Sequence, residues 1–109
     1  MATDWAAHIK EHVPNADDEA IAGIIRHCGI SLHKVDSSLV SFGDPAELAR
    51  VRDGFMKKKL ALTDPDEELD AVLAKIGEKL KTATRKYRPT VYYMLADHYG
   101  KLDLFKKSK

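Results

Sequence analysis

The stretch that decides the fold reads YRPTVYYMLADHYGKLDLF and spans residues 87–105 of the 109-residue chain. It holds all four tyrosines, and its apolar side chains would cover more than half of the circumference of a helix. Pro89 suits the first turn of a helix, where no N–H is needed, and Gly100 suits the residue just after its end. We therefore predict a central core helix over residues 89–99, with the segment after it folding back.

Four further helices are expected before this core helix. Their apolar residues recur at three- and four-residue spacing, as Ile21, Ile24 and Ile25 do. The predicted helices span residues 4–13, 16–28, 45–59 and 65–82, and a connector without periodicity spans residues 30–44. This pattern indicates an all-α fold, with the whole chain in a single compact domain of about five helices.

Capping residues mark the starts of these helices. Asn15 is expected to cap the second helix. An Asp-Pro-x-Glu sequence opens the third helix at Asp44 and the fourth at Asp64. In both, we expect the aspartate to cap the helix and the glutamate, Glu47 or Glu67, to reach back toward the cap.

The composition is that of an ordinary globular chain, with 44% hydrophobic and 32% charged residues. A single cysteine excludes an internal disulfide and favours a reducing compartment. No apolar run approaches the roughly 18 residues of a membrane span, and the first residues lack the pattern of a signal peptide. We expect a cytoplasmic protein that does not interact with a membrane.

The net charge of +1 is unevenly distributed. Residues 1–54 hold five basic and nine acidic residues, whereas residues 55–109 hold thirteen and eight. Acidic first turns and basic last turns, which complement helix dipoles, account for much of this difference. They do not account for the basic run at residues 85–88, because positive charge is unfavourable just before a helix begins.

These considerations single out a candidate binding surface along a basic edge. Tyr93 and the arginines at the entrance of the last helix are expected to face outward. For residues 85–88, the favoured interpretation is a solvated connector whose arginines pair with acidic first turns of neighbouring helices. The candidate residues are Lys58, Arg85, Lys86, Arg88 and Tyr93.

Two other groups of residues were considered as chemical sites. His8 and His12 are four residues apart with Glu11 beside them, a spacing that can bind a divalent metal when the fold supplies further ligands. Solvent-facing or half-buried histidines are the favoured interpretation, and no metal or cofactor is predicted. Cys28 lies on the apolar stripe of its helix and is expected to behave as a small buried hydrophobe.

The sequence gives little support to an enzyme. It contains no nucleophile elbow, Walker loop, dinucleotide-binding fingerprint or metal-ligand motif, so no catalytic residue is predicted. An enzyme would need a site assembled only in the fold, such as a pocket where His27, His98 or Cys28 meets a carboxylate.

The chain resembles a family of short uncharacterised bacterial proteins known as domain of unknown function 2853. The resemblance covers nearly the whole chain and is carried by residues 26–30, 38–42, 50–60, 90–95 and 100–105. It implies a compact all-helical domain and supplies no activity, cofactor or catalytic residue.

The preferred hypothesis is a protein–protein interaction module that docks an acidic protein surface or a second copy of itself. The five acidic residues between Asp64 and Asp70 offer a complementary patch for such self-association. The first alternative is weak binding of nucleic acid or a phosphate ligand at residues 85–88, although a pI near 7.9 is low for a nucleic-acid-binding domain. The second alternative is an enzyme.

Overall fold

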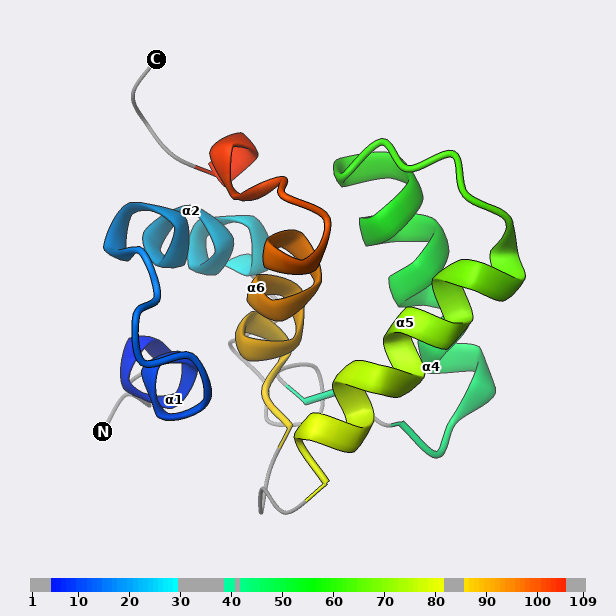
Figure 1. The fold of residues 1–109 in the computed structure, drawn as a ribbon, viewed down its shortest axis with the longest axis horizontal. Coiled ribbons are helices and arrows are strands. Elements are labelled where there is room, and N and C mark those ends of the chain that lie inside the picture. Colours follow the sequence, from blue (N-terminus) through cyan, green and yellow to red (C-terminus); the bar gives the residue numbers. More distant parts are fainter. Residues whose placement is uncertain (1–4, 30–38, 41, 82–85, 106–109) are drawn as a thin grey trace.

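The computed structural model describes residues 5–29, 39–40, 42–81 and 86–105, and these residues form an all-α fold (Figure 1). The π-helix η2 directly continues α4, so the described residues form the five predicted helices and one short 3-10 helix, η3. The elements are α1 (Trp5–His12), α2 (Asp18–Cys28), α4 (Pro45–Arg50), η2 (Val51–Lys59), α5 (Asp66–Lys79), α6 (Arg88–His98) and η3 (Leu102–Phe105).

Helix α6 lies in the middle of the molecule. Figure 1 shows α1 and α2 on one side of it and α4 and α5 on the other. Every residue from Pro89 to Ala96 is buried, whereas a surface helix would bury only one stripe. The prediction of a central core helix over residues 89–99 is therefore confirmed, with the helix beginning one residue earlier.

The chain folds back after α6, as predicted. Gly100 adopts a left-handed conformation with φ of 67°, and the N–H of Lys101 donates to the carbonyl oxygen of Ala96 at 2.8 Å. This turn lets η3 pack on α2, where Phe105 is buried. A side chain on Gly23 of α2 would collide with the Phe105 carbonyl, so the approach of these two elements requires a glycine.

The predicted helix over residues 45–59 is helical throughout, but its second part is wound as a π-helix. Val51 and Leu60 are nine residues apart, about two and a half α-helical turns, so an α-helix would place them on opposite faces. Both are buried, together with Phe55 and Met56. The wider π-helix, with its i→i+5 hydrogen bonds, brings these four apolar side chains onto one face. The N–H of Leu60 donates to the Phe55 carbonyl at 2.9 Å, which is this five-residue step.

The start of α2 differs slightly from the prediction. The carboxylate of Asp17 accepts hydrogen bonds from the N–H groups of Glu19 at 2.8 Å and Ala20 at 3.2 Å. Asp17, and not Asn15, therefore caps α2. Aspartate and asparagine are similarly good N-caps, so residue preference alone does not decide between Asn15 and Asp17.

The two Asp-Pro-x-Glu sequences behave differently. Asp44 caps α4 as predicted, since its carboxylate accepts from the N–H of Ala46 at 3.0 Å. At α5 the cap position is held by Pro65, and no side chain caps the helix there. The prediction for Asp64 is therefore wrong. The chain reaches α5 through a loop in which Ala61 has a positive φ of 56°.

Part of the predicted connector is visible. Leu39 forms an isolated antiparallel bridge with Tyr87, and the N–H of Val40 donates to the carbonyl of Lys86 at 2.9 Å. Residues 30–38 and 41 of the connector lie outside the described residues. The bridge ties the chain before α4 to the chain before α6.

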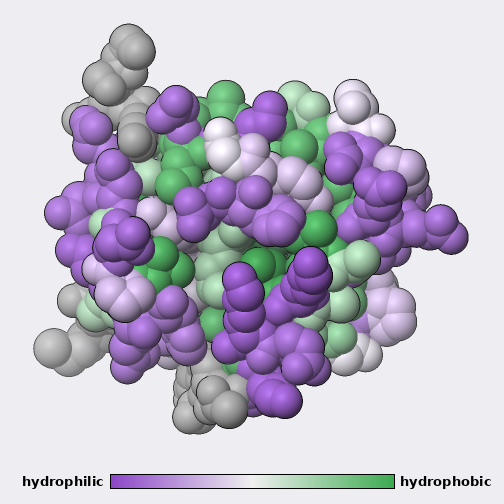
Figure 2. Space-filling view, viewed as in Figure 1, coloured by the Kyte–Doolittle hydropathy of each residue, from purple (hydrophilic) through white to green (hydrophobic). Residues whose placement is uncertain are grey.

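The face of the molecule seen in Figure 2 is largely hydrophilic. In Figure 2, charged and polar side chains cover most of the visible face, and hydrophobic residues show mainly in the gaps between them. Among the described residues, Leu104 is the one large hydrophobic residue with an exposed side chain, at 48%. None of the helices in the described part of the chain is long and apolar enough to cross a membrane.

Candidate functional site

Arg88 does not face outward as predicted. Its Nη2 donates to Oε2 of Glu47 at 2.7 Å and to the Leu39 carbonyl at 3.2 Å, and its Nη1 donates to the Tyr92 hydroxyl at 3.2 Å. The side chains of Arg88 and Glu47 are each only 13% exposed. Arg88 therefore links α6 to α4 and to the connector. The sequence predicts that the carboxylate of Glu47 reaches back to the cap of its own helix, but in the structure this carboxylate binds Arg88.

The outward orientation predicted for Tyr93 is also wrong. Tyr93 is 2% exposed, and its hydroxyl accepts the N–H of Asp17 at 2.8 Å, next to the start of α2. Of the other candidates, Lys58 is exposed and Lys86 is half-buried, while Arg85 lies outside the described residues. Two of the five residues predicted for the basic edge, Arg88 and Tyr93, therefore lie in the interior, because α6 is covered on more sides than its sequence indicated.

About half of the lysines and arginines among the described residues form ion pairs with carboxylates of the chain. Arg52 forms ion pairs with Asp66 and Asp70, and Lys57 forms one with Asp66. Both aspartates belong to the acidic patch for which the sequence predicts a role in self-association. Ion pairs join Lys10 to Asp18, Arg50 to Glu47, Arg52 to Asp53, Asp66 and Asp70, Lys57 to Asp53 and Asp66, Lys81 to Glu78, and Arg88 to Glu47.

Two of the cations without such an ion pair to a described residue, Arg26 and Lys59, lie at one hollow. This hollow of about 330 Å³, which we call the basic hollow, is open to solvent and lies between α2, the end of η2, and η3. Within the described part of the chain, no carboxylate lies within ion-pair distance of Arg26 or Lys59. The residues that line the hollow are Gly23, Arg26, His27, Lys59, Leu104 and Phe105.

Aromatic rings lie beneath the basic hollow and position its polar groups. The ring centroid of His27 lies 5.6 Å from that of Phe55 and 6.0 Å from that of Phe105. Phe55 in turn stacks on Tyr92 of α6 at 3.9 Å, and Lys59 Nζ lies 5.2 Å from the centre of the Phe105 ring. The π-helix η2 thus turns Phe55 inward and also places Lys59, its last residue, at the hollow.

The pKa of His27 is lowered from its ordinary value of 6.5. Partial burial of the ring is the larger cause, and the positive charge of Lys59 adds to it. The imidazole is therefore mainly neutral near pH 7. A bound anion would raise this pKa, because negative charge favours the protonated ring.

The side chains considered for catalysis are not brought together in the hollow. Cys28 is buried, as predicted, and burial raises the pKa of its thiol to about 12, although the charge of Arg88 opposes the shift. His98 is exposed and its ring contacts Tyr99. The lining of the basic hollow includes His27 but neither Cys28, His98 nor a carboxylate.

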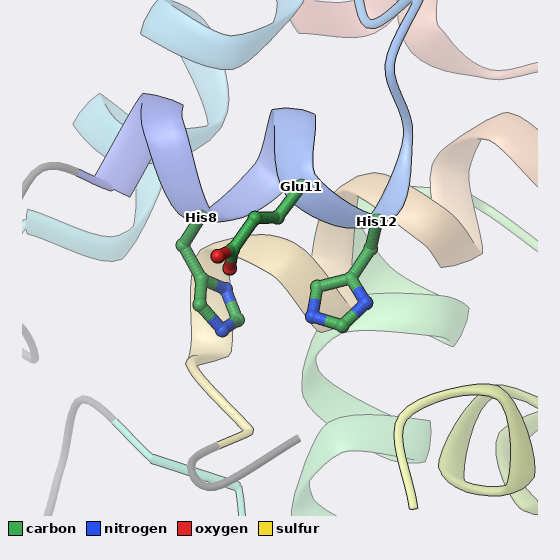
Figure 3. Close-up of side chains that lie close together, drawn as sticks. All are labelled: His8, Glu11 and His12. Atoms are coloured by element: carbon green, nitrogen blue, oxygen red, sulfur yellow. The ribbon is translucent and has the colours of Figure 1, made fainter. Parts of the chain in front are cut away.

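His8, Glu11 and His12 lie close together on one face of α1 (Figure 3). One potential ligand atom from each residue lies within 4.8 Å of those of the other two. The histidine spacing was evident in the sequence. The full pattern, His-x-x-Glu-His, was also available as a signal, because residues three and four apart share a helix face. Arg26, His27 and Lys59 gave no such signal, since only the fold brings their elements together.

One family model matches the chain. Its description is "Protein of unknown function (DUF2853)", and the match covers residues 4–103. Both the histidine cluster on α1 and the cations of the basic hollow lie within the matched residues. No curated protein matches the chain.

Proposed function

The chain belongs to the DUF2853 family, whose function is unknown, and we propose from the geometry that it is a protein-interaction module. It docks an acidic and partly apolar segment of a partner protein in the basic hollow. Carboxylates of the partner pair with Arg26 and Lys59, and an apolar side chain packs on Leu104 and Phe105.

The observation that carries this proposal is that two cations without an ion pair to a described residue line one hollow together with the exposed side chain of Leu104. The neighbouring Lys57, two residues before Lys59, is bound to Asp53 and Asp66, and Arg52 is bound to three carboxylates. Arg26 and Lys59 form no ion pair with a described residue, and both line the basic hollow. The guanidinium of an arginine can bind a carboxylate through two parallel hydrogen bonds, so the hollow has a donor suited to an acidic side chain.

The apolar part of the hollow supports a protein partner. Leu104 is 48% exposed and adjoins Phe105. Interface centres are enriched in aromatic residues and arginine, and charged groups around them add specificity and speed to association. A segment with aspartate or glutamate next to leucine or phenylalanine would satisfy both parts of the hollow.

The alternatives have less support. Nucleic-acid-binding domains usually carry an extended basic stripe, whereas here Arg52, Lys57 and Arg88 form ion pairs with carboxylates of the chain and the net charge is +1. Small-molecule sites bury most of their ligand, but the basic hollow is open to solvent. Among the described residues that line the hollow, no carboxylate accompanies His27 as the partner of an acid–base pair.

Peptide selection by phage display on the purified protein tests the proposal. The selected peptides should be rich in Asp and Glu beside apolar residues. Their affinity should fall at least about tenfold for the double variant Arg26→Glu/Lys59→Glu. The matched control, Lys75→Glu/Lys79→Glu on α5, makes the same change in net charge and should bind within about twofold of the wild type.

The outcome that overturns the proposal is equally clear. Selected peptides without acidic enrichment, or an equal loss of affinity in both double variants, would show that the basic hollow is not the docking site. Circular dichroism of both variants ensures that the comparison is made between folded proteins.

A further inference from the structure

Helix α1 presents three metal-binding side chains to the same side (Figure 3). His8, Glu11 and His12 occupy positions i, i+3 and i+4, which are neighbours on a helix surface. The rings of His8 and His12 lie 5.0 Å apart between centroids, and one potential ligand atom from each of the three residues lies within 4.8 Å of those of the other two. The cluster is separate from the basic hollow, which is built from α2, η2 and η3.

His8 is held in place by the core helix. Its Nδ1 lies 2.5 Å from Oγ1 of Thr90, a fully buried residue in the first turn of α6. The ring of Tyr87 packs edge-on against it at 4.6 Å between centroids. Metal-binding histidines typically donate a hydrogen bond from one ring nitrogen to an orienting group and bind the ion with the other. In the tautomer that donates from Nδ1 to Thr90, the lone pair that can bind an ion is on Nε2.

From these contacts we propose that His8, Glu11 and His12 form a binding site for a divalent transition-metal ion such as Zn²⁺. Two imidazoles and one carboxylate are a donor set suited to Zn²⁺, Co²⁺ and Ni²⁺, whereas Ca²⁺ and Mg²⁺ prefer oxygen ligands alone. Three protein ligands leave room for water or a further group on the ion.

Binding requires a small contraction of the cluster. Ligands about 2.0–2.2 Å from one ion cannot be 4.8 Å apart, so side chains must turn inward by roughly half an ångström or more. Glu11 is exposed, and its carboxylate accepts no hydrogen bond from any described residue. Glu11 and the half-buried His12 can therefore turn toward the fixed ring of His8.

Isothermal titration of the untagged, metal-free protein with ZnSO₄ at pH 7.5 tests this site. We expect one ion per chain at Zn²⁺ concentrations below about 100 µM. His12→Gln should weaken binding at least about tenfold, whereas His98→Gln, which removes an exposed histidine on α6, should leave it unchanged. Titration with Co²⁺ gives a second readout, since its visible absorption reports the number and geometry of ligands.

Two further measurements separate metal binding from a structural role of these residues. Thr90→Val should weaken Zn²⁺ binding by about tenfold while keeping one site per chain, because Thr90 only orients His8. Binding should also weaken as the pH is lowered, because protons compete with a metal ion for its ligands. The proposal is overturned if no ion binds in this range, or if His12→Gln and Glu11→Gln bind Zn²⁺ as tightly as the wild type.

Discussion

The guanidinium of Arg88 and the carboxylate of Glu47 form an ion pair of 2.7 Å in which each side chain is only 13% exposed. The pair joins the core helix α6 to α4. Glu47 also contacts Arg50, a much more exposed cation on its own helix. The same carboxylate thus has one buried and one exposed partner, and these should differ greatly in their effect on stability.

Replacing Arg88 with alanine should be strongly destabilising. Removing one member of a buried ion pair leaves the other charge without compensation, at a cost of about 3–5 kcal/mol. Arg50→Ala should cost about 1 kcal/mol or less, because an exposed pair contributes little. Urea denaturation of both variants gives the comparison. A cost below about 1 kcal/mol for Arg88→Ala would mean that the pair does not hold α6 to α4.

Gly23→Ala should destabilise the protein by about 1–3 kcal/mol. The added methyl group would collide with the carbonyl of Phe105 and push η3 away from α2. Gly54→Ala is the matched control, since a side chain there meets no atom within 4 Å, and it should be neutral or stabilising by up to about 1 kcal/mol. Equal effects of the two substitutions in urea denaturation would contradict the close packing of α2 and η3.

His27 should titrate below pH 6.5 in the folded protein, because burial and Lys59 lower the pKa of its imidazole. The unfolded chain then binds this proton more readily than the native state. The contribution of His27 to stability is therefore full above pH 6.5 and is lost as the pH falls from 6.5 through its folded pKa. NMR titration of the His27 ring checks this, and Lys59→Met should raise its pKa. An unchanged pKa in this variant would exclude the influence of Lys59.

Tyr99→Phe should be neutral or stabilising by up to about 1 kcal/mol. The Tyr99 hydroxyl is buried and has no hydrogen-bond partner among the described residues, so removing it relieves an uncompensated loss of hydration. Burial, followed by the charges of Asp64 and Glu68, raises the pKa of this hydroxyl. Thermal unfolding provides the measurement, and a clear loss of stability would show that the hydroxyl forms a bond that the structure does not contain.

The sequence predicted the helices because their signals are local. Apolar spacing placed every helix, and Asp44 and Gly100 marked two of the ends correctly. The π-helical winding after Arg50 was not predictable in this way, because the burial of Leu60 depends on the elements that cover it. Asp64 shows the same limit. The Asp-Pro-x-Glu sequence predicts that Asp64 caps α5, but Pro65 occupies the cap position.

The candidate sites differ in the same way, because a site on one helix has a local signal and a site built from several elements has none. The histidine cluster lies on one short helix, so its spacing was visible in the sequence. Arg88 and Tyr93 were expected on the surface because of their polar groups, but their partners Glu47 and Asp17 lie 41 and 76 residues away. The basic hollow draws on three separate elements, and no local pattern connects Arg26 to residues near 59 and 105.

The most direct test of the proposed docking site is an NMR titration of the ¹⁵N-labelled protein with a selected acidic peptide. The largest amide shifts should fall at Arg26, His27, Lys59 and Phe105, and they should diminish as NaCl is raised from about 50 to 500 mM, because exposed charge pairs are screened. Shifts centred on α5, or binding that does not respond to salt, would contradict docking in the basic hollow.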